Sequence, residues 1–192
     1  MTILIFGLLI FLGIHSVGLF APTWRQRRVA RLGVGAWKGL FSLIAVAGFV
    51  LIIWGFQRAR LDPVLLYASP AWLGHLNALF TLVGFILLAA AYVPGNRIKA
   101  KIGHPMVAGV KIWALGHLLA IGFLRDVLLF GAFLAWAIAA FAILRRRDRA
   151  SGVTYPPGTL KGDVITLVVG VVAWGLFAFW LHGPLIGVRP FG

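Results

Sequence analysis

Two histidines in long apolar stretches are the residues of this chain whose type and setting could do chemistry. His15 lies within residues 3–20 and His117 within residues 106–124. Because a polar side chain inside hydrocarbon is costly, each histidine needs a partner or a function. Two deep imidazoles without a cysteine or an intramembrane acid fit bis-imidazole ligation of a haem better than a hydrolytic zinc site. We expect His15 and His117 to bind the haem iron; hydrogen bonding between helices is the structural alternative.

A second candidate site combines three basic side chains, Arg97, His104 and Lys111. His104 and Lys111 are seven residues apart, so they share a face if the helix begins early, and both then point toward the basic loop that contains Arg97. Such a cluster suits an anion, either haem propionates, a lipid phosphate or the phosphates of a nucleotide. Snorkelling of Lys111 to the membrane surface is the alternative. His75 and His182 fall near helix ends at the opposite surface, where we expect structural roles.

Other kinds of site are disfavoured by what the chain lacks. It has no cysteine, which excludes disulfides, iron–sulfur clusters and a cysteine nucleophile. Its acidic residues are four aspartates, and all four are expected in loops: Asp62, Asp126, Asp148 and Asp163. A carboxylate mechanism inside the membrane is therefore not expected.

The elements that position these residues are predicted to be membrane helices. Of the 192 residues, 61% are hydrophobic, and the mean hydropathy is +1.00, which excludes an ordinary soluble domain. Six apolar runs are long enough, or nearly so, to cross a bilayer: 3–20, 39–56, 72–93, 106–124, 127–144 and 164–181. Only Arg125 and Asp126 separate the fourth run from the fifth, so these two runs should form an antiparallel hairpin. We expect an all-α, polytopic membrane helix bundle of about six transmembrane helices, formed by residues 1–192 as one domain.

The basic residues predict the orientation of the bundle. Four lie in the segments after the second, fourth and sixth runs. Thirteen lie in the segments after the first, third and fifth runs: Arg25, Arg27, Arg28, Arg31, Lys38, Arg97, Lys99, Lys101, Arg145, Arg146, Arg147, Arg149 and Lys161. Because cytoplasmic loops carry the excess of Lys and Arg, both termini should face the other side, N-out and C-out. We expect the protein to contact the lipid bilayer and to bind either a hydrophobic small molecule or other membrane proteins. We do not expect it to bind nucleic acid.

Several phrases along the chain resemble the NnrU family of bacterial membrane proteins. They are LGIHS (12–16), WKGL (37–40), AYVP (91–94), RIKAKIGHPMV (97–107), KIWALGHLL (111–119), LFGAF (129–133) and HGPLIGVRPFG (182–192). The resemblance runs the whole length, so residues 1–192 are interpreted as one NnrU-type transmembrane domain. It implies a multi-pass protein of the bacterial inner membrane with a link to denitrification, the reduction of nitrite and nitric oxide.

The chain is also distantly similar to 15-cis-zeta-carotene isomerase, a haem-b membrane enzyme. This resemblance implies that His15 and His117 correspond to the ligand histidines of that enzyme. The isomerase has a cysteine shortly before its second histidine, whereas Ala114 stands here, so thiolate ligand exchange is not available. The two functional hypotheses are a haem-dependent isomerase or redox protein acting on a hydrophobic substrate, and a nonenzymatic membrane factor for assembly or maturation of denitrification reductases.

A weaker resemblance is to membrane methyltransferases related to isoprenylcysteine carboxyl methyltransferase, which bind S-adenosylmethionine. It is carried by residues 103–109, GHPMVAG. Gly103 stands where those enzymes have an arginine, and the chain has no glutamate to complete their site. The haem hypothesis is therefore preferred.

Overall fold

Helices account for most of the chain in a computed structural model that describes residues 1–191. Within residues 1–191 the only β-structure is two isolated β-bridges. Five stretches are helices long and apolar enough to cross a membrane: Thr2–Phe20, Val34–Ala59, Trp72–Tyr92, Leu124–Ala150 and Leu160–Ile186. A helix satisfies its backbone hydrogen bonds internally, as hydrocarbon requires. The prediction of an all-α polytopic membrane bundle is confirmed. The chain divides into two compact units, Met1–Val64 and Leu65–Gly192, which are described separately.

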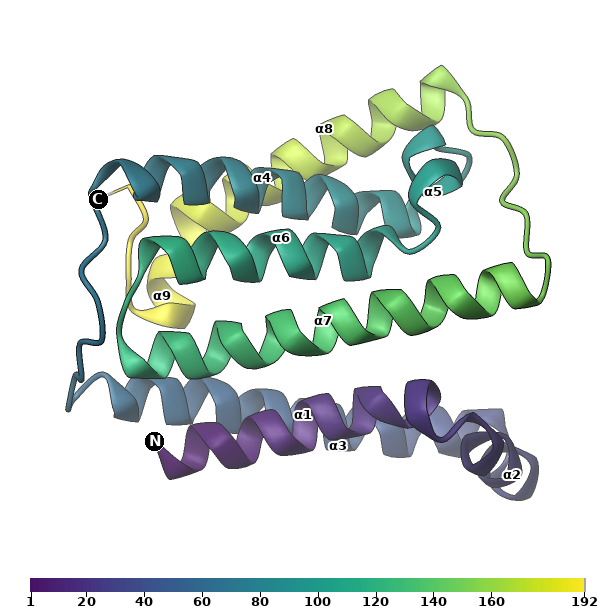
Figure 1. Cartoon of the computed structure of the whole chain (residues 1–192), viewed down its shortest axis with the longest axis horizontal. Helices are drawn as coiled ribbons and strands as arrows, with labels where there is room; N and C mark the ends of the chain where they lie inside the picture. The colour runs from purple at the N-terminus through teal and green to yellow at the C-terminus, as the bar shows by residue number, and fades with distance from the viewer. Residues whose placement is uncertain (192) are drawn as a thin grey trace. The chain divides into compact units, whose positions relative to one another are not determined.

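Unit 1 is built on a pair of antiparallel helices, α1 (Thr2–Phe20) and α3 (Val34–Ala59) (Figure 1). Glycines let their backbones approach closely. A Cβ on Gly7 would lie 2.6 Å from the Ile52 backbone nitrogen, and one on Gly48 would lie 2.8 Å from the Phe11 nitrogen. Small residues at such contacts are typical of membrane helix pairs, because association there depends on close packing.

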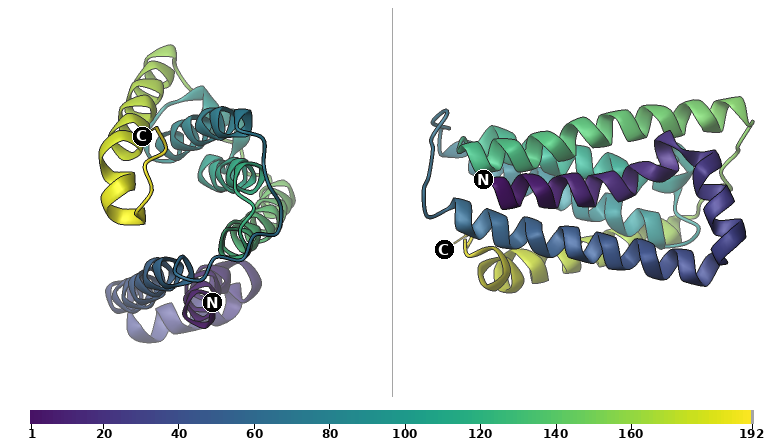
Figure 2. Two further views of the ribbon diagram at one scale, coloured as in Figure 1. Left: turned by 90° about the vertical axis from the view of Figure 1, so that its left-hand side faces the viewer. Right: turned by 90° about the horizontal axis from the view of Figure 1, so that it is seen from below.

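A short helix, α2 (Pro22–Leu32), joins α1 to α3. It crosses the ends of both helices (Figure 2). Single residues separate it from its neighbours: Ala21 before it, and Gly33 after it with φ +82°, a left-handed value that favours glycine. The sequence alone predicts only a basic loop for this segment.

Unit 2 is a row of four longer helices in the spatial order α8, α4, α6, α7 (Figure 1), and the row is curved when seen along the helix axes (Figure 2). They are α4 (Trp72–Tyr92), α6 (Pro105–Ala120), α7 (Leu124–Ala150) and α8 (Leu160–Leu176). Glycines again allow close packing: a Cβ on Gly109 would lie 2.9 Å from the Gly84 oxygen of α4, and one on Gly170 would lie 2.6 Å from the Ile86 Cα. A π-helix, η1 (Phe177–Leu181), continues α8 into the short α9 (His182–Ile186).

The hairpin between α6 and α7 differs from the predicted one. Residues 121–123 form the link, whereas Arg125 and Asp126 lie in the first turn of α7, so the prediction that they separate the helices is wrong. Helix α6 has 16 residues, about 24 Å at 1.5 Å per residue. The carbonyls at its end are satisfied by side chains from the segment before α4: the Tyr67 hydroxyl donates to the Leu118 and Ile121 oxygens, and Ser69 donates to the Leu119 oxygen at 2.8 Å. These side chains cap the helix end.

The opposite end of unit 2, here called the basic end, holds residues 96–104 and 145–163. Its central element is the short helix α5 (Arg97–Ile102). Asn96, 3% exposed, joins α4 to α5: its amide donates to the Ala90 and Val93 oxygens, and its Oδ1 accepts from the Lys99 nitrogen at 2.6 Å. Thr159 caps α8 by accepting from the Gly162 nitrogen at 3.1 Å. Side-chain caps of this kind fix where helices begin.

Candidate functional site

His117 lies in an aromatic environment between α6 and α7 in unit 2. It is buried, with 9% of its surface exposed. Its ring stacks on Phe130 with centroids 4.2 Å apart and lies 5.3 Å from the Trp113 ring. Trp113 also meets Phe130 and Phe133 edge-on. The imidazole is therefore held among rings that exclude water.

His15 is half-buried on α1 in unit 1. Its ring lies 4.3 Å from the Phe11 ring and 5.1 Å, edge-on, from the Phe41 ring of α3. The aromatic contacts again come from its own helix and from the helix that packs against it.

The two histidines share one local hydrogen bond. His15 Nδ1 lies 2.6 Å from the Phe11 oxygen, and His117 Nδ1 lies 2.9 Å from the Trp113 oxygen, each four residues earlier in its helix. A carbonyl oxygen only accepts, so Nδ1 carries the proton in the neutral ring and Nε2 carries the lone pair. Metal-binding histidines commonly donate one ring N–H to a carbonyl and bind the metal with the other nitrogen. The donor chemistry of both residues therefore fits a haem iron.

At the basic end, His104 belongs to a hydrogen-bonded cluster with Asp148 and Tyr155. Its Nε2 donates to Asp148 Oδ2 at 2.8 Å, and the Tyr155 hydroxyl donates to the same oxygen at 2.8 Å. Arg145 Nη1 lies 4.0 Å from that oxygen. Partial burial and the hydrogen bond to Asp148 raise the pKa of Tyr155 above its usual value of 10.0, so the phenol remains a donor at neutral pH. The cluster joins the start of α6, the end of α7 and the following loop.

The other two residues of the predicted anion site have different neighbours. The Arg97 backbone nitrogen donates to Asp163 Oδ1 at 2.6 Å, and its Nε lies 3.6 Å from Asp163 Oδ2. Lys111 Nζ lies 3.9 Å from the centroid of the Phe141 ring on α7. An anion at His104 or Arg97 would meet a carboxylate already in place, whereas Lys111 faces an aromatic ring.

The expectation that all four aspartates lie in loops is wrong. Asp126 and Asp148 lie in α7, and Asp163 lies in the first turn of α8. Asp126 is 2% exposed, and its Oδ2 lies 3.3 Å from Arg125 Nε. The Arg125 guanidinium also lies 4.3 Å from the Phe123 ring. The sequence signal for this pair was adjacent opposite charges between two apolar runs.

The remaining histidines lie elsewhere in unit 2. His75 is exposed in the first turn of α4. His182 begins α9, and its Nδ1 donates to the Val188 oxygen at 2.7 Å. Within residues 1–191, no group of three or more histidine, cysteine or acidic side chains is arranged to hold a metal ion.

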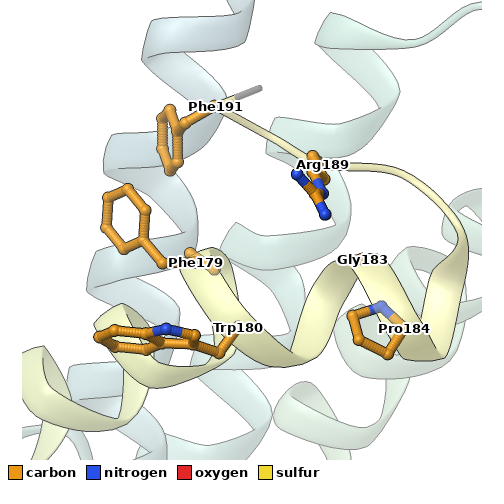
Figure 3. Close-up of a pocket in the computed structure, with 7 residues that line it drawn as sticks. Phe179, Trp180, Gly183, Pro184, Arg189 and Phe191 are labelled. Atoms are coloured by element: carbon orange, nitrogen blue, oxygen red, sulfur yellow. The ribbon is translucent and has the colours of Figure 1, made fainter.

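A pocket of about 320 Å³ lies where η1 and α9 meet the C-terminal segment (Figure 3). None of the residues predicted to form a site lines it. Three of the residues that line it are aromatic and one is a cation; the lining is formed by Ala178, Phe179, Trp180, Gly183, Pro184, Arg189 and Phe191. The Phe179 and Phe191 rings stack at 5.1 Å across its edge.

Comparison with known proteins identifies the family. The profile described as NnrU protein matches residues 3–190. No curated protein and no solved structure matches the chain, and the similarity to 15-cis-zeta-carotene isomerase is therefore not among these findings. The profile covers nearly the whole sequence, including the segments that hold His15 and His117. The chain belongs to the NnrU protein family.

Proposed function

We propose that this protein resides in the bacterial inner membrane and binds haem b with His15 and His117 as axial ligands. The observation that carries the proposal is the shared hydrogen bond from each Nδ1 to the carbonyl four residues earlier. It sets the tautomer that presents Nε2, the nitrogen a haem iron needs.

The surroundings of the two rings support a cofactor role. Each ring is surrounded by aromatic side chains from its own helix and from the helix packed against it. Phe130 and Trp113 keep the region around His117 apolar. Ligand identity and burial are the means by which a protein tunes a haem.

The proposed activity is that of an isomerase or redox protein for a hydrophobic substrate. Bound haem would supply one-electron chemistry at the iron. The chain has no cysteine, so a thiolate cannot replace an imidazole, and this favours electron transfer over an isomerisation that depends on ligand exchange. We place the activity in denitrification because of the family link. The alternative is a nonenzymatic membrane factor for assembly or maturation of denitrification reductases.

Purification separates the two hypotheses. The full-length protein is purified in detergent from haem-replete cells, and haem is measured by Soret absorbance, pyridine haemochrome and elemental iron. Haem in stoichiometric amount is expected, and the double variant His15→Ala/His117→Ala, purified identically, should lack it. Absence of both Soret absorbance and iron from the wild type would remove the cofactor proposal and leave the assembly factor as the leading hypothesis.

A further inference from the structure

Helix α2 carries a dense positive charge that has no acidic partner in unit 1. Its 11 residues include four arginines, at positions 25, 27, 28 and 31. The first acidic residue of the chain is Asp62, which follows the far end of α3. Among the described residues none of the four arginines forms an ion pair. The charge of α2 is therefore available to a ligand from outside the chain.

The position of α2 indicates where that ligand lies. One residue connects it to α1 and one to α3, and both of these helices are long and apolar enough to cross a membrane. It runs across their ends rather than along them (Figure 2). A helix held in this way lies along the membrane surface, at the level of the lipid headgroups.

One face of α2 combines arginine with tryptophan. Trp24, Arg27, Arg28 and Arg31 follow the spacing i, i+3, i+4, i+7, which places them on one side of a helix. The Arg28 guanidinium lies 5.1 Å from the Trp24 ring centroid, and the Trp24 ring meets Trp37 edge-on at 5.9 Å. Trp24 is nevertheless 42% exposed, and no residue of α2 is buried.

We propose that this face binds the phosphate groups of anionic phospholipids. Guanidinium groups bind phosphate oxygens through paired, charge-assisted hydrogen bonds. Tryptophan favours the interface because its ring is apolar and its N–H is polar. Lipid is preferred over a soluble anion because the connections to α1 and α3 keep α2 beside the headgroups.

Lipid binding to the full-length protein tests this proposal. The delipidated protein, in neutral detergent, is titrated with phosphatidylglycerol or with phosphatidylcholine, and bound lipid is counted by native mass spectrometry. Phosphatidylglycerol should bind more tightly than zwitterionic phosphatidylcholine. The variant Arg27→Gln/Arg31→Gln should weaken phosphatidylglycerol binding on the order of tenfold, from the usual contribution of basic residues near a charged membrane.

Matched variants keep the test specific. Arg58→Gln/Arg189→Gln removes the same charge from residues outside α2 and should leave the affinity for phosphatidylglycerol unchanged. Arg27→Lys/Arg31→Lys keeps the charge but loses the paired hydrogen bonds of the guanidinium groups, so its affinity for phosphatidylglycerol should lie between those of the wild type and of Arg27→Gln/Arg31→Gln; this variant also checks that the helix tolerates substitution. Equal losses in the two glutamine variants would overturn the proposal, as would equal binding of the two lipids. Displacement of phosphatidylglycerol by equimolar inorganic phosphate would overturn the preference for lipid.

Discussion

His104 and Asp148 join the start of α6 to the end of α7 through a hydrogen bond of 2.8 Å. Seven residues further along α6, and seven residues back along α7, Lys111 lies over the ring of Phe141. From the first pair to the second, the residue number rises by seven in α6 and falls by seven in α7, as expected for two antiparallel helices that pack side by side. Together they fix the register of α6 and α7.

Asp148→Asn should lower the melting temperature of the purified protein. The substitution removes the charge that accepts from both His104 and Tyr155, and charge-assisted hydrogen bonds are the stronger kind. Thermal unfolding in detergent, followed by circular dichroism, measures the effect. Asp62→Asn changes an aspartate in the loop after α3 and serves as the control. A melting temperature equal to that of the wild type would mean that the cluster does not hold the helices together.

The helices could largely be predicted from the sequence, because apolar runs of this length have few alternatives in a membrane. Helix α2 could not be predicted from the sequence, because four arginines in 11 residues are equally typical of a basic loop. Asp126 was misplaced because a charged pair between two apolar runs also fits a turn. Its burial beside Arg125 depends on where α7 begins, and the carbonyl of Phe123 fixes that start by accepting from the nitrogens of Asp126 and Val127.

For the candidate site, the residue types could be predicted but their neighbours could not. His15 and His117 can be identified from the sequence because each is a polar residue within an apolar run. Their bonds to the carbonyl four residues earlier depend on side-chain rotamers that a sequence does not reveal. The partners of His104 and Arg97 lie 44 and 66 residues away, and no local pattern links them.

The orientation inferred from the basic residues can be tested with reporter fusions. A reporter fused after Gly192 should be active on the periplasmic side, and one inserted between Arg145 and Lys161 on the cytoplasmic side. Alkaline phosphatase and green fluorescent protein report the two sides. Activity of both fusions on the same side would contradict the predicted topology, and the 16-residue α6 would be the first helix to re-examine.

Gly7→Leu should destabilise unit 1. Even the first side-chain atom would lie 2.6 Å from the backbone of α3, and overpacking typically costs about 1–3 kcal/mol. Gly13→Leu places the same side chain on the same helix, where a Cβ meets nothing within 4 Å, and should be tolerated. Unfolding titrations in mixed micelles compare the two variants. Equal stability would show that α1 and α3 do not depend on this contact.

The hypothesis that Lys111, His104 and Arg97 hold an anionic group of the cofactor is tested by Lys111→Met. Methionine is less costly than lysine in lipid, so the protein should fold and insert normally. If the three residues hold the anionic group, the variant should retain less haem than the wild type after purification. Lys161→Met, at the exposed start of α8, is the matched control. Haem retention equal to that of the wild type would mean that Lys111 only packs against Phe141.

The absorption spectra of four single histidine variants test the central claim most directly. His15→Ala and His117→Ala should each abolish the low-spin spectrum of a bis-imidazole haem, because removal of either axial ligand changes the coordination of the iron. His75→Ala and His182→Ala should preserve it, since His75 is exposed and His182 already donates to the Val188 oxygen. A low-spin spectrum that survives in His15→Ala or in His117→Ala would contradict the assignment of that residue as a ligand.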